Sequence, residues 1–179
     1  MIFRKPKVWI TSDLHFYHDK IIEYCGRPKD YQEKIIKGFE VIEDKDILIC
    51  LGDVSWGRQV EFARDVLTKV KGKKILTIGN HDDSKPFMYY LHNGWDFACE
   101  SFSLDYMGKK IIFSHKPMFW DGTWEINIHG HFHNNLNPQY YSKCAENYCK
   151  LIALEYLDYQ PVLLENVLTK KSPYYKKKE

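Results

Sequence analysis

The strongest constraint on the fold is an arrangement that occurs three times in the first half of the sequence. Short apolar runs at residues 8–11, 46–51 and 73–78 each end in a polar cluster, and segments with helical spacing at 30–41 and 58–70 separate them. Strands that alternate with helices in this way predict a β-α-β-α-β unit with a parallel sheet. Because such connections are right-handed, the three strands should end at one edge of the sheet. Ligand sites of open α/β sheets lie at that edge.

The second half of the chain follows a different pattern. Residues 95–106 and 109–114 alternate like two antiparallel strands, with Met107 and Gly108 as a tight turn between them. The remaining expected elements are helices at 18–24, 84–92 and 161–168 and strands at 125–129 and 151–156. We therefore predict an α/β protein with α+β character, in which a parallel half continues into a more antiparallel half within one domain, 1–169.

The length of 179 residues, with 44% hydrophobic side chains, suits one domain with a sizeable core. Helical spacing assigns these side chains to the inner faces of the two long helices: Ile35, Ile36, Phe39, Val60, Ala63, Val66, Leu67 and Val70. The net charge of +2 provides no general attraction to nucleic acid or to a membrane surface.

The cysteines and the chain ends indicate where such a protein works. Five cysteines without a CxxC pair argue against a secreted disulfide framework, and Cys144 and Cys149 have no second pair with which to form a zinc knuckle. The sequence contains no signal-peptide stretch and no membrane-span length of apolar residues, so we expect a soluble, cytoplasmic protein. The lysine-rich segment 170–179 predicts a solvated, flexible tail, with a weak contact to a polyanion as the alternative.

Metal-competent side chains follow each of the three apolar runs. Asp13 and His15 come after the first run, and their i, i+2 spacing places both side chains on the same side of an extended chain. Asp53 follows the second run, and Asn80 and His81 follow the third. A carboxylate and an imidazole that converge at a strand end can form half of a metal site.

A second concentration of imidazoles lies later in the chain, where His129, His131 and His133 occur within five residues. Gly130 allows a tight bend, so that neighbouring imidazoles can point at one spot. Taken alone, this stretch also fits a histidine-rich surface loop. His115 follows the expected strand 109–114 and adds another imidazole at a strand end.

Together, the strand ends carry more metal-competent groups than chance packing explains. They are Asp13, His15, Asp53, Asn80, His81, His115, His131 and His133. Two acids, an amide and several imidazoles are enough for two divalent ions that share one carboxylate. No run of acidic oxygens favours calcium, and no thiolate set favours structural zinc. Mixed nitrogen and oxygen ligands suit manganese first, and iron, zinc or nickel as alternatives.

The order of these groups resembles the signature of the calcineurin-like metallophosphoesterases. The matching blocks are Asp13-x-His15, Gly52-Asp53, Gly79-Asn80-His81-Asp82, His115 and Gly130-His131-x-His133. The chain looks like the small, single-domain bacterial and phage phosphoesterases of that superfamily. The resemblance implies a four-layer αββα sandwich of two mixed sheets flanked by helices, with the site at the strand ends.

The resemblance also implies a role for each matching residue. His81 would stand over the substrate without binding metal, and Asp82 would support the site from behind. The implied metal ligands are Asp13, His15 and His133 for one ion, Asn80, His115 and His131 for the other, and Asp53 as the bridge. His129 is left without a ligand role, and we interpret it as structural.

These roles describe a hydrolytic reaction. Two cations can clamp a phosphoryl group, and a water that bridges them loses a proton easily. The resulting hydroxide would attack phosphorus in line, and His81 would supply the proton that the leaving group needs. We therefore expect a metal-dependent phosphoesterase or phosphodiesterase that acts on a small phosphorylated substrate, nucleotides included.

Other residues near the blocks are candidates for contact with the substrate. His18 could line the cleft, and Arg27 and Arg58 could contact a substrate phosphate, although solvated arginines fit the sequence equally well. The aromatic residues that either stack on a nucleobase or pack as a local core are Trp56, Phe119, Trp120 and Trp124.

Three alternatives rank below this prediction. A nuclease is disfavoured because the near-neutral charge gives no basic stripe for nucleic acid. A catalytically silent scaffold on the same fold is disfavoured because every block is intact. A protein Ser/Thr phosphatase is disfavoured because the stretch 54–58 lacks the Asp that follows the Gly-Asp block in that branch.

Overall fold

The computed structural model describes residues 4–82, 85–134 and 148–169. The predicted tail, 170–179, and Cys144 lie outside these ranges. The four cysteines within them are free thiols. No helix in the described part of the chain is long and apolar enough to cross a membrane.

The first sheet is built around the three predicted strands. Its strands in chain order are β1 (Val8–Thr11), β2 (Ile47–Cys50), β3 (Lys73–Thr77), β4 (Phe97–Cys99) and β9 (Val162–Leu163). Across the sheet the order is β4-β3-β2-β1-β9, with β9 antiparallel to β1 and every other pair parallel. Ile10 lies opposite Ile49 in this register. The parallel unit is confirmed, and the carboxyl ends of β1, β2 and β3 meet at one edge.

The second sheet corrects the prediction for the second half. Its strands are β5 (Ser101–Tyr106), β6 (Lys109–Ser114), β7 (Ile126–His129) and β8 (Cys149–Leu151), in that order across the sheet. β5 and β6 form the expected hairpin, with Met107 and Gly108 both at positive φ in the turn. However, β6, β7 and β8 run parallel. The expected strand 95–106 is two strands, because β4 completes the first sheet before the chain crosses to the second.

The helices are shorter than the sequence pattern indicates. They are α1 (Lys20–Cys25), α2 (Tyr31–Gly38), α3 (Gln59–Asp65), α4 (Phe87–His92) and α6 (Leu164–Thr169), with 3-10 turns η1 (Phe39–Val41), η2 (Leu67–Lys69) and η3 (Leu154–Tyr156). The expected helix 58–70 breaks at Val66, whose φ of −121° is not helical. Ile36 and Val60 are 42% and 55% exposed, so their assignment to inner faces was wrong. The expected strand 151–156 ends at Leu151 and is followed by η3.

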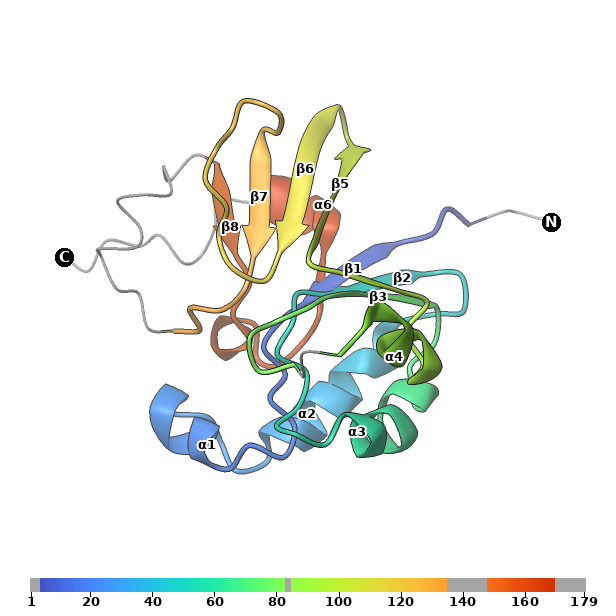
Figure 1. The fold of residues 1–179 in the computed structure, drawn as a ribbon, viewed down its shortest axis with the longest axis vertical. Helices are drawn as coiled ribbons and strands as arrows, with labels where there is room; N and C mark the ends of the chain where they lie inside the picture. The colour runs from blue at the N-terminus through green and yellow to red at the C-terminus, as the bar shows by residue number, and fades with distance from the viewer. Residues whose placement is uncertain (1–3, 83–84, 135–147, 170–179) are drawn as a thin grey trace.

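Alternation along the strands divides the core into two layers. Leu48 of β2 faces the helices and packs in a cluster with Ile35 of α2 and Phe62 of α3. Its neighbour Ile49 faces the second sheet and packs in a cluster with Phe113 of β6. Figure 1 shows α1 to α4 on the side of the first sheet that faces away from β5–β8. Two mixed sheets therefore pack face to face with flanking helices, as the resemblance implied.

Candidate metal centre

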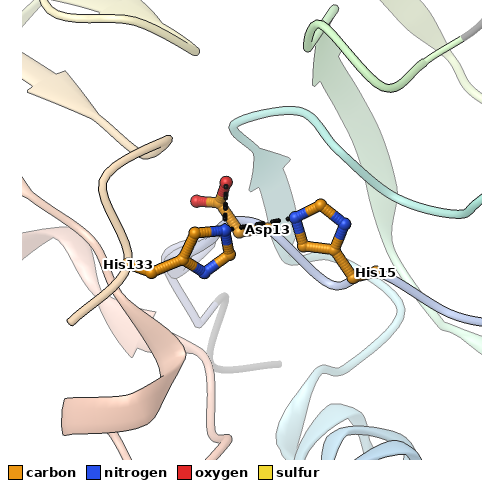
Figure 2. Close-up of side chains that lie close together, drawn as sticks. All are labelled: Asp13, His15 and His133. Carbon is orange, nitrogen blue, oxygen red and sulfur yellow. Dashed lines mark hydrogen bonds and ion pairs between the residues drawn. The ribbon is translucent and has the colours of Figure 1, made fainter. Parts of the chain in front are cut away.

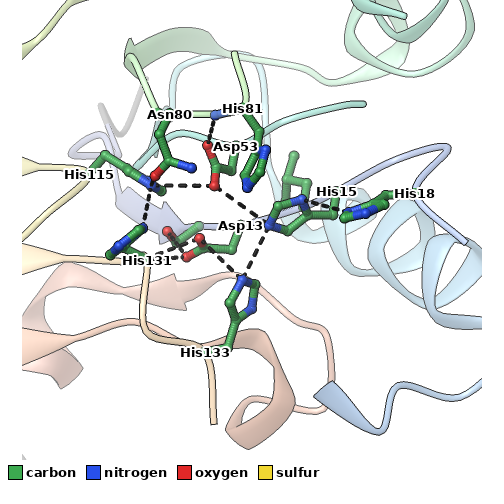
Figure 3. A network of polar contacts seen from close by, with 12 residues as sticks. Asp13, His15, His18, Asp53, Asn80, His81, His115, His131 and His133 are labelled. Carbon is green, nitrogen blue, oxygen red and sulfur yellow. Dashed lines mark hydrogen bonds and ion pairs between the residues drawn. The ribbon is translucent and has the colours of Figure 1, made fainter. Parts of the chain in front are cut away.

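All of the predicted metal ligands converge at the carboxyl ends of the strands (Figure 3). They come from five loops: Asp13 and His15 after β1, Asp53 after β2, Asn80 after β3, His115 after β6, and His131 and His133 after β7. The first three loops belong to one sheet and the last two to the other. The site therefore requires the two sheets to pack face to face.

The first trio consists of Asp13, His15 and His133, whose ligand atoms all lie within 4.8 Å of one another. The Nε2 atoms of His15 and His133 are 3.2 Å apart, and His133 Nε2 lies 3.7 Å from Asp13 Oδ1. Figure 2 shows the two rings and the carboxylate turned toward one point. Three donors that face a common point are a suitable arrangement for one cation.

The second trio consists of Asp53, His115 and His131, again within 4.8 Å of one another. His115 Nε2 lies 3.1 Å from His131 Nδ1 and 3.3 Å from Asp53 Oδ2. The amide oxygen of Asn80 is 2.9 Å from the same His115 nitrogen. The second trio and Asn80 therefore present nitrogen and oxygen donors to a second point.

Asp53 is a member of the second trio and also approaches the first. Its Oδ2 atom is 3.6 Å from His15 Nε2 and 3.3 Å from His115 Nε2. Its Oδ1 atom accepts a hydrogen bond of 2.8 Å from the backbone N–H of His81. The resemblance places the shared carboxylate at this point between two ligand sets.

The backbone at the site adopts a conformation that residues other than glycine avoid. Nine described non-glycine residues have positive φ, and five of them are predicted ligands: Asp13, His15, Asp53, His131 and His133. Asp13 and His15, at 51° and 50°, are therefore not extended, and the argument from i, i+2 spacing was wrong. Left-handed backbone costs free energy and clusters at functional sites.

Two glycines make room for the carboxylates. Gly130 is not at positive φ, so it does not supply the bend that its sequence position suggested. A side chain there would overlap Ser12 Oγ and Asp13 Oδ2. A side chain at Gly79 would overlap Asp53 Oδ1 in the same way. These glycines let separate loops approach until their ligand atoms meet.

Hydrogen bonds behind the ligands fix which ring nitrogens face the centre. His115 Nδ1 donates to the carbonyl oxygen of Leu51 at 2.7 Å, which turns Nε2 toward the centre. His133 Nδ1 lies 3.1 Å from Glu155 Oε1, and Arg27 pairs with that carboxylate at 2.8 Å. Sequence reasoning missed Glu155. The available signal was one acid directly after the apolar run 151–154.

Charges in the first trio favour a positive charge at its centre. Burial alone would lower the pKa of His133, but the carboxylates of Asp13 and Glu155 raise it to about 10. Burial lowers the pKa of the neighbouring His15 to about 2. A protonated imidazole therefore faces a neutral one, and the proton occupies the place of a cation.

The second trio repeats this arrangement. Burial alone would lower the pKa of His115, but the hydrogen bond with Asp53 and the charge of Asp13 raise it to about 9. Burial lowers the pKa of His131 to about 4. Each trio thus combines one carboxylate, a neutral imidazole and an imidazole that keeps its proton. These donor sets fit two divalent cations, each of which would displace a proton.

A cleft of about 550 Å³ opens beside the trios, and His81 lies in its wall. The His81 ring centre is 5.4 Å from that of His15, and His81 belongs to neither trio. His18 also lines the cleft, as expected, and its Nδ1 atom lies 3.4 Å from His15 Nδ1. The cleft is the place from which a substrate can reach the centre.

Asp82 lies behind the cleft, where it joins two loops. Its carboxylate accepts backbone N–H groups of Gly79 at 2.7 Å, Val54 at 2.9 Å and Asp53 at 3.0 Å. Gln59 Nε2 donates to it at 3.2 Å. Asp82 does not line the cleft. It therefore positions the loop of Asp53.

The two arginines are not placed for the substrate contact that we considered. Arg27 is only 3% exposed, and besides Glu155 it binds the carbonyl oxygens of Asp13 and Leu14. Arg58 does not line the cleft and stacks over Tyr17 at 4.4 Å. Arg27 braces the loop of the first trio, and Arg58 lies on the surface.

His129 is buried at the end of β7 and belongs to neither trio. Its Nδ1 donates to the carbonyl oxygen of Gly130 at 2.9 Å. A third group of close donor atoms, Cys25, Glu155 and His133, shares its histidine with the first trio. Arg27 already neutralises Glu155, so we assign no ion to that group.

Comparison with known proteins identifies the family. The family model described as calcineurin-like phosphoesterase matches residues 6–158. The chain belongs to the calcineurin-like phosphoesterase family. The matched segment contains every member of both trios and His81. Membership in this family and the His and Asp groups together support a metal-dependent phosphoesterase.

Relatives of this calcineurin-like chain occur in archaea and phages. It is 29% identical over 173 residues to the uncharacterized protein MJ1445 of Methanocaldococcus jannaschii, a match that covers 90% of this chain and 89% of that protein. It is 29% identical over 161 residues to the gene 66 protein of Mycobacterium phage D29, covering 72% and 79% of the two chains. The crystal structure of AQ665, a protein of unknown function from Aquifex aeolicus, matches with a TM-score of 0.75 at 26% identity, covering 91% and 98%.

Proposed function

We propose that the protein is a dinuclear metal-dependent hydrolase of phosphoric esters. The observation that carries the proposal is the convergence of two ligand trios, in which Asp53 of the second trio also approaches His15 of the first. We assign Asp53 to both ions, because its Oδ2 atom lies between His15 and His115. The full assignment is Asp13, His15 and His133 for one ion, Asn80, His115 and His131 for the other, and Asp53 for both.

The donor set supports a choice of metals. Each site combines imidazole nitrogen with carboxylate oxygen, and Asn80 adds an amide oxygen to one of them. Carboxylate and carbonyl oxygens suit manganese, while imidazole suits iron, zinc and nickel. We propose two manganese ions as the first choice, with the other three metals as alternatives.

Divalent cations held there would withdraw charge from the phosphoryl oxygens and make a water molecule acidic enough to attack phosphorus. The residues of the chain do the remaining work. Asp53 accepts the backbone N–H of His81 and so fixes that segment beside the trios. A ring N–H of His81 gives its proton to the departing oxygen of the ester. His81 is placed for this because its ring lines the cleft without joining a trio.

The volume and the lining of the cleft also indicate which class of substrate can bind there. Its volume of about 550 Å³ lies within the usual range for small-molecule sites. Among the described residues that line it, Lys20 is the one lysine or arginine, so they form no cationic track for a long polyanion. We therefore propose a small phosphate ester as the substrate, with a nuclease as the less favoured alternative. The free thiols of the described cysteines are consistent with action in the cytoplasm.

The proposal is tested by removing metal and restoring it. Protein stripped by a chelator is reloaded with manganese, iron, zinc or nickel and assayed with p-nitrophenyl phosphate, bis-p-nitrophenyl phosphate and 2′,3′-cyclic nucleotides. We expect no turnover without metal and full turnover after reloading with one of them. Preference for the bis-ester would select a phosphodiesterase.

The alternatives predict different results in the same assay. A scaffold would bind metal but hydrolyse none of the esters with any metal. A nuclease would cleave DNA oligonucleotides, and its binding to them would weaken as salt is added. Either result would overturn the proposed activity on small esters.

A further inference from the structure

The loop aromatics of this protein lie in different places. Trp56 lines the cleft beside the trios, together with Tyr24 and Phe132. Trp120 and Trp124 instead line a separate hollow beside the start of β6. The sequence did not decide whether Trp56, Trp120 and Trp124 stack on a nucleobase or pack as a local core. Of these three, Trp56 is the one placed to meet a substrate.

Trp56 is held firmly at that position. Its backbone N–H donates to the carbonyl oxygen of Phe16 at 2.9 Å, and a parallel bridge joins Phe16 to Ser55. Its ring stacks on His18 at 4.2 Å between centres, with 11° between the planes. His18 in turn approaches His15 of the first trio. The pairing of β1 with β2 thus continues past the strand ends and fixes the indole next to the metal centre.

The indole is nevertheless 47% exposed. His18 stacks on one of its faces, and His81 lies 4.9 Å away between ring centres at a tilt of 44°, which is not a stacked arrangement. By contrast, Trp95 and Trp124 are each 4% exposed and serve as core. A half-exposed indole that is held by a backbone hydrogen bond and by stacking on His18 offers a flat surface that is in place before a ligand arrives.

The other lining residues restrict what can bind beside the phosphate. No arginine lines the cleft among the described residues, and Lys20 is the one lysine. Besides Trp56, the lining includes Tyr24, Ile21 and Phe132, which are apolar or aromatic. The part of a substrate that extends from the metal centre past Trp56 can therefore contact aromatic and apolar side chains.

We propose that Trp56 forms a stacking subsite for a flat aromatic group of the substrate, such as the nucleobase of a nucleotide. This inference rests on the proposed function, because the phosphate of the same ester would lie at the trios. Stacking one base on one aromatic side chain strengthens binding about 5- to 100-fold. The subsite accepts any base, because every base presents a π-face.

The test compares two ligands that differ only in the base. Binding of AMP and of ribose 5-phosphate to manganese-loaded protein is measured by calorimetry. We expect AMP to bind about 5- to 100-fold more tightly than ribose 5-phosphate. Trp56→Ala should abolish this preference, and Trp56→Phe should keep most of it. Trp120→Ala removes an exposed tryptophan outside the cleft and should leave the preference as in the unmodified protein.

Several results would overturn the subsite. One is equal binding of the two ligands by the unmodified protein, which requires no variant to fold. Another is a preference that persists in Trp56→Ala. Manganese content is measured in each variant, since a Trp56→Ala protein that loses manganese would show that the indole only supports His18 and His15. If no ester is hydrolysed but AMP is still preferred, the proposed activity fails and the subsite stands.

Discussion

Two buried acidic centres lie at opposite ends of β2, and they are built differently. Asp46 precedes the strand, and each of its close partners is a hydrogen-bond donor. Its carboxylate accepts from Arg4 Nη2 at 2.8 Å, Lys7 N at 3.0 Å, Trp9 Nε1 at 3.1 Å and Glu43 N at 3.1 Å. The Asp46 carboxylate is therefore satisfied without any further group.

The centre around Asp53, at the other end of β2, is not complete in this way. His15 and His133 bring their Nε2 atoms to 3.2 Å, and the rings of His115 and His131 approach to 3.1 Å. Two imidazole nitrogens at that distance need a proton or a cation between them. The comparison teaches that burial of an acid does not identify a site. A site is identified instead by lone pairs that converge without enough hydrogen-bond donors to satisfy them.

The comparison is tested most strongly by the same substitution at both ends. Asp53→Asn should reduce phosphoesterase turnover to background and release metal. Loss of a group that only hydrogen-bonds to a metal ligand already lowers metal affinity or activity about 10- to 100-fold, and loss of a ligand should lower them further. Asp46→Asn should keep turnover and metal content. Metal content by elemental analysis and the rise in Tm on adding manganese check both variants.

Asp53 would lose its assignment as the shared ligand if Asp53→Asn kept both metal ions. The contrast between the two ends would also fail if Asp46→Asn released metal while it remained folded. A cooperative thermal unfolding transition of the metal-free variant separates this result from simple unfolding, because only a folded protein shows one.

Within the site, His81 should separate catalysis from metal binding. His81→Ala should lower kcat by about 10²- to 10⁴-fold, the usual effect of removing a general acid. Metal content should stay nearly intact, because His81 belongs to neither trio. His92→Ala changes an exposed histidine of α4 and serves as the matched control. Loss of metal from His81→Ala would make His81 a ligand and refute its role as proton donor.

A smaller effect should follow from the residues behind the first trio. Glu155→Gln should weaken metal binding about 10- to 100-fold, because Glu155 orients the ring of His133 through Nδ1. Metal affinity is measured by competition with a chelating dye. Glu61→Gln, which alters an exposed pair with Arg58, is the control and should not change it. Equal affinities in the two variants would contradict the orienting role of Glu155.

The positions of the proposed metal ligands could be predicted because each one lies in a short block directly after an apolar run in the sequence. Parallel strands bring their carboxyl ends together whatever the loops do. Asp13 and Asp53 could therefore be placed near each other from the sequence alone. The same logic recovered the parallel pairing of β1, β2 and β3.

What failed depends on contacts between distant segments. The positive φ of His15 and the close approach of Gly130 to Ser12 arise only when separate loops pack together. Arg27 looked available because its partners lie in the loop of the first trio and at Glu155, 128 residues away. Local propensity cannot show that β4 and β5 join different sheets.

The smallest effect concerns stability alone. Burial would raise the pKa of Asp46, but the hydrogen bonds from Lys7, Trp9, Glu43 and Arg4 lower it from 3.8 to about 2. A lowered carboxyl pKa contributes stability above pH 3.8, and that contribution is lost as the pH falls through about 2. Asp46→Asn should therefore reduce the free energy of unfolding by about 1.5 to 3 kcal/mol at neutral pH, since an amide N–H would face the donors.

The pH dependence distinguishes this charge effect from a change in packing. Urea unfolding of metal-free protein, measured from neutral pH downward, should show the difference between Asp46→Asn and the unmodified protein shrinking below pH 3.8. If the difference in free energy of unfolding stayed constant across that range, Asp46 would stabilise the protein through its packing and not through its charge. In that case packing around Asp46 would explain the difference between the Asp46 and Asp53 centres. The unsatisfied lone pairs at the Asp53 centre would no longer be needed to explain it.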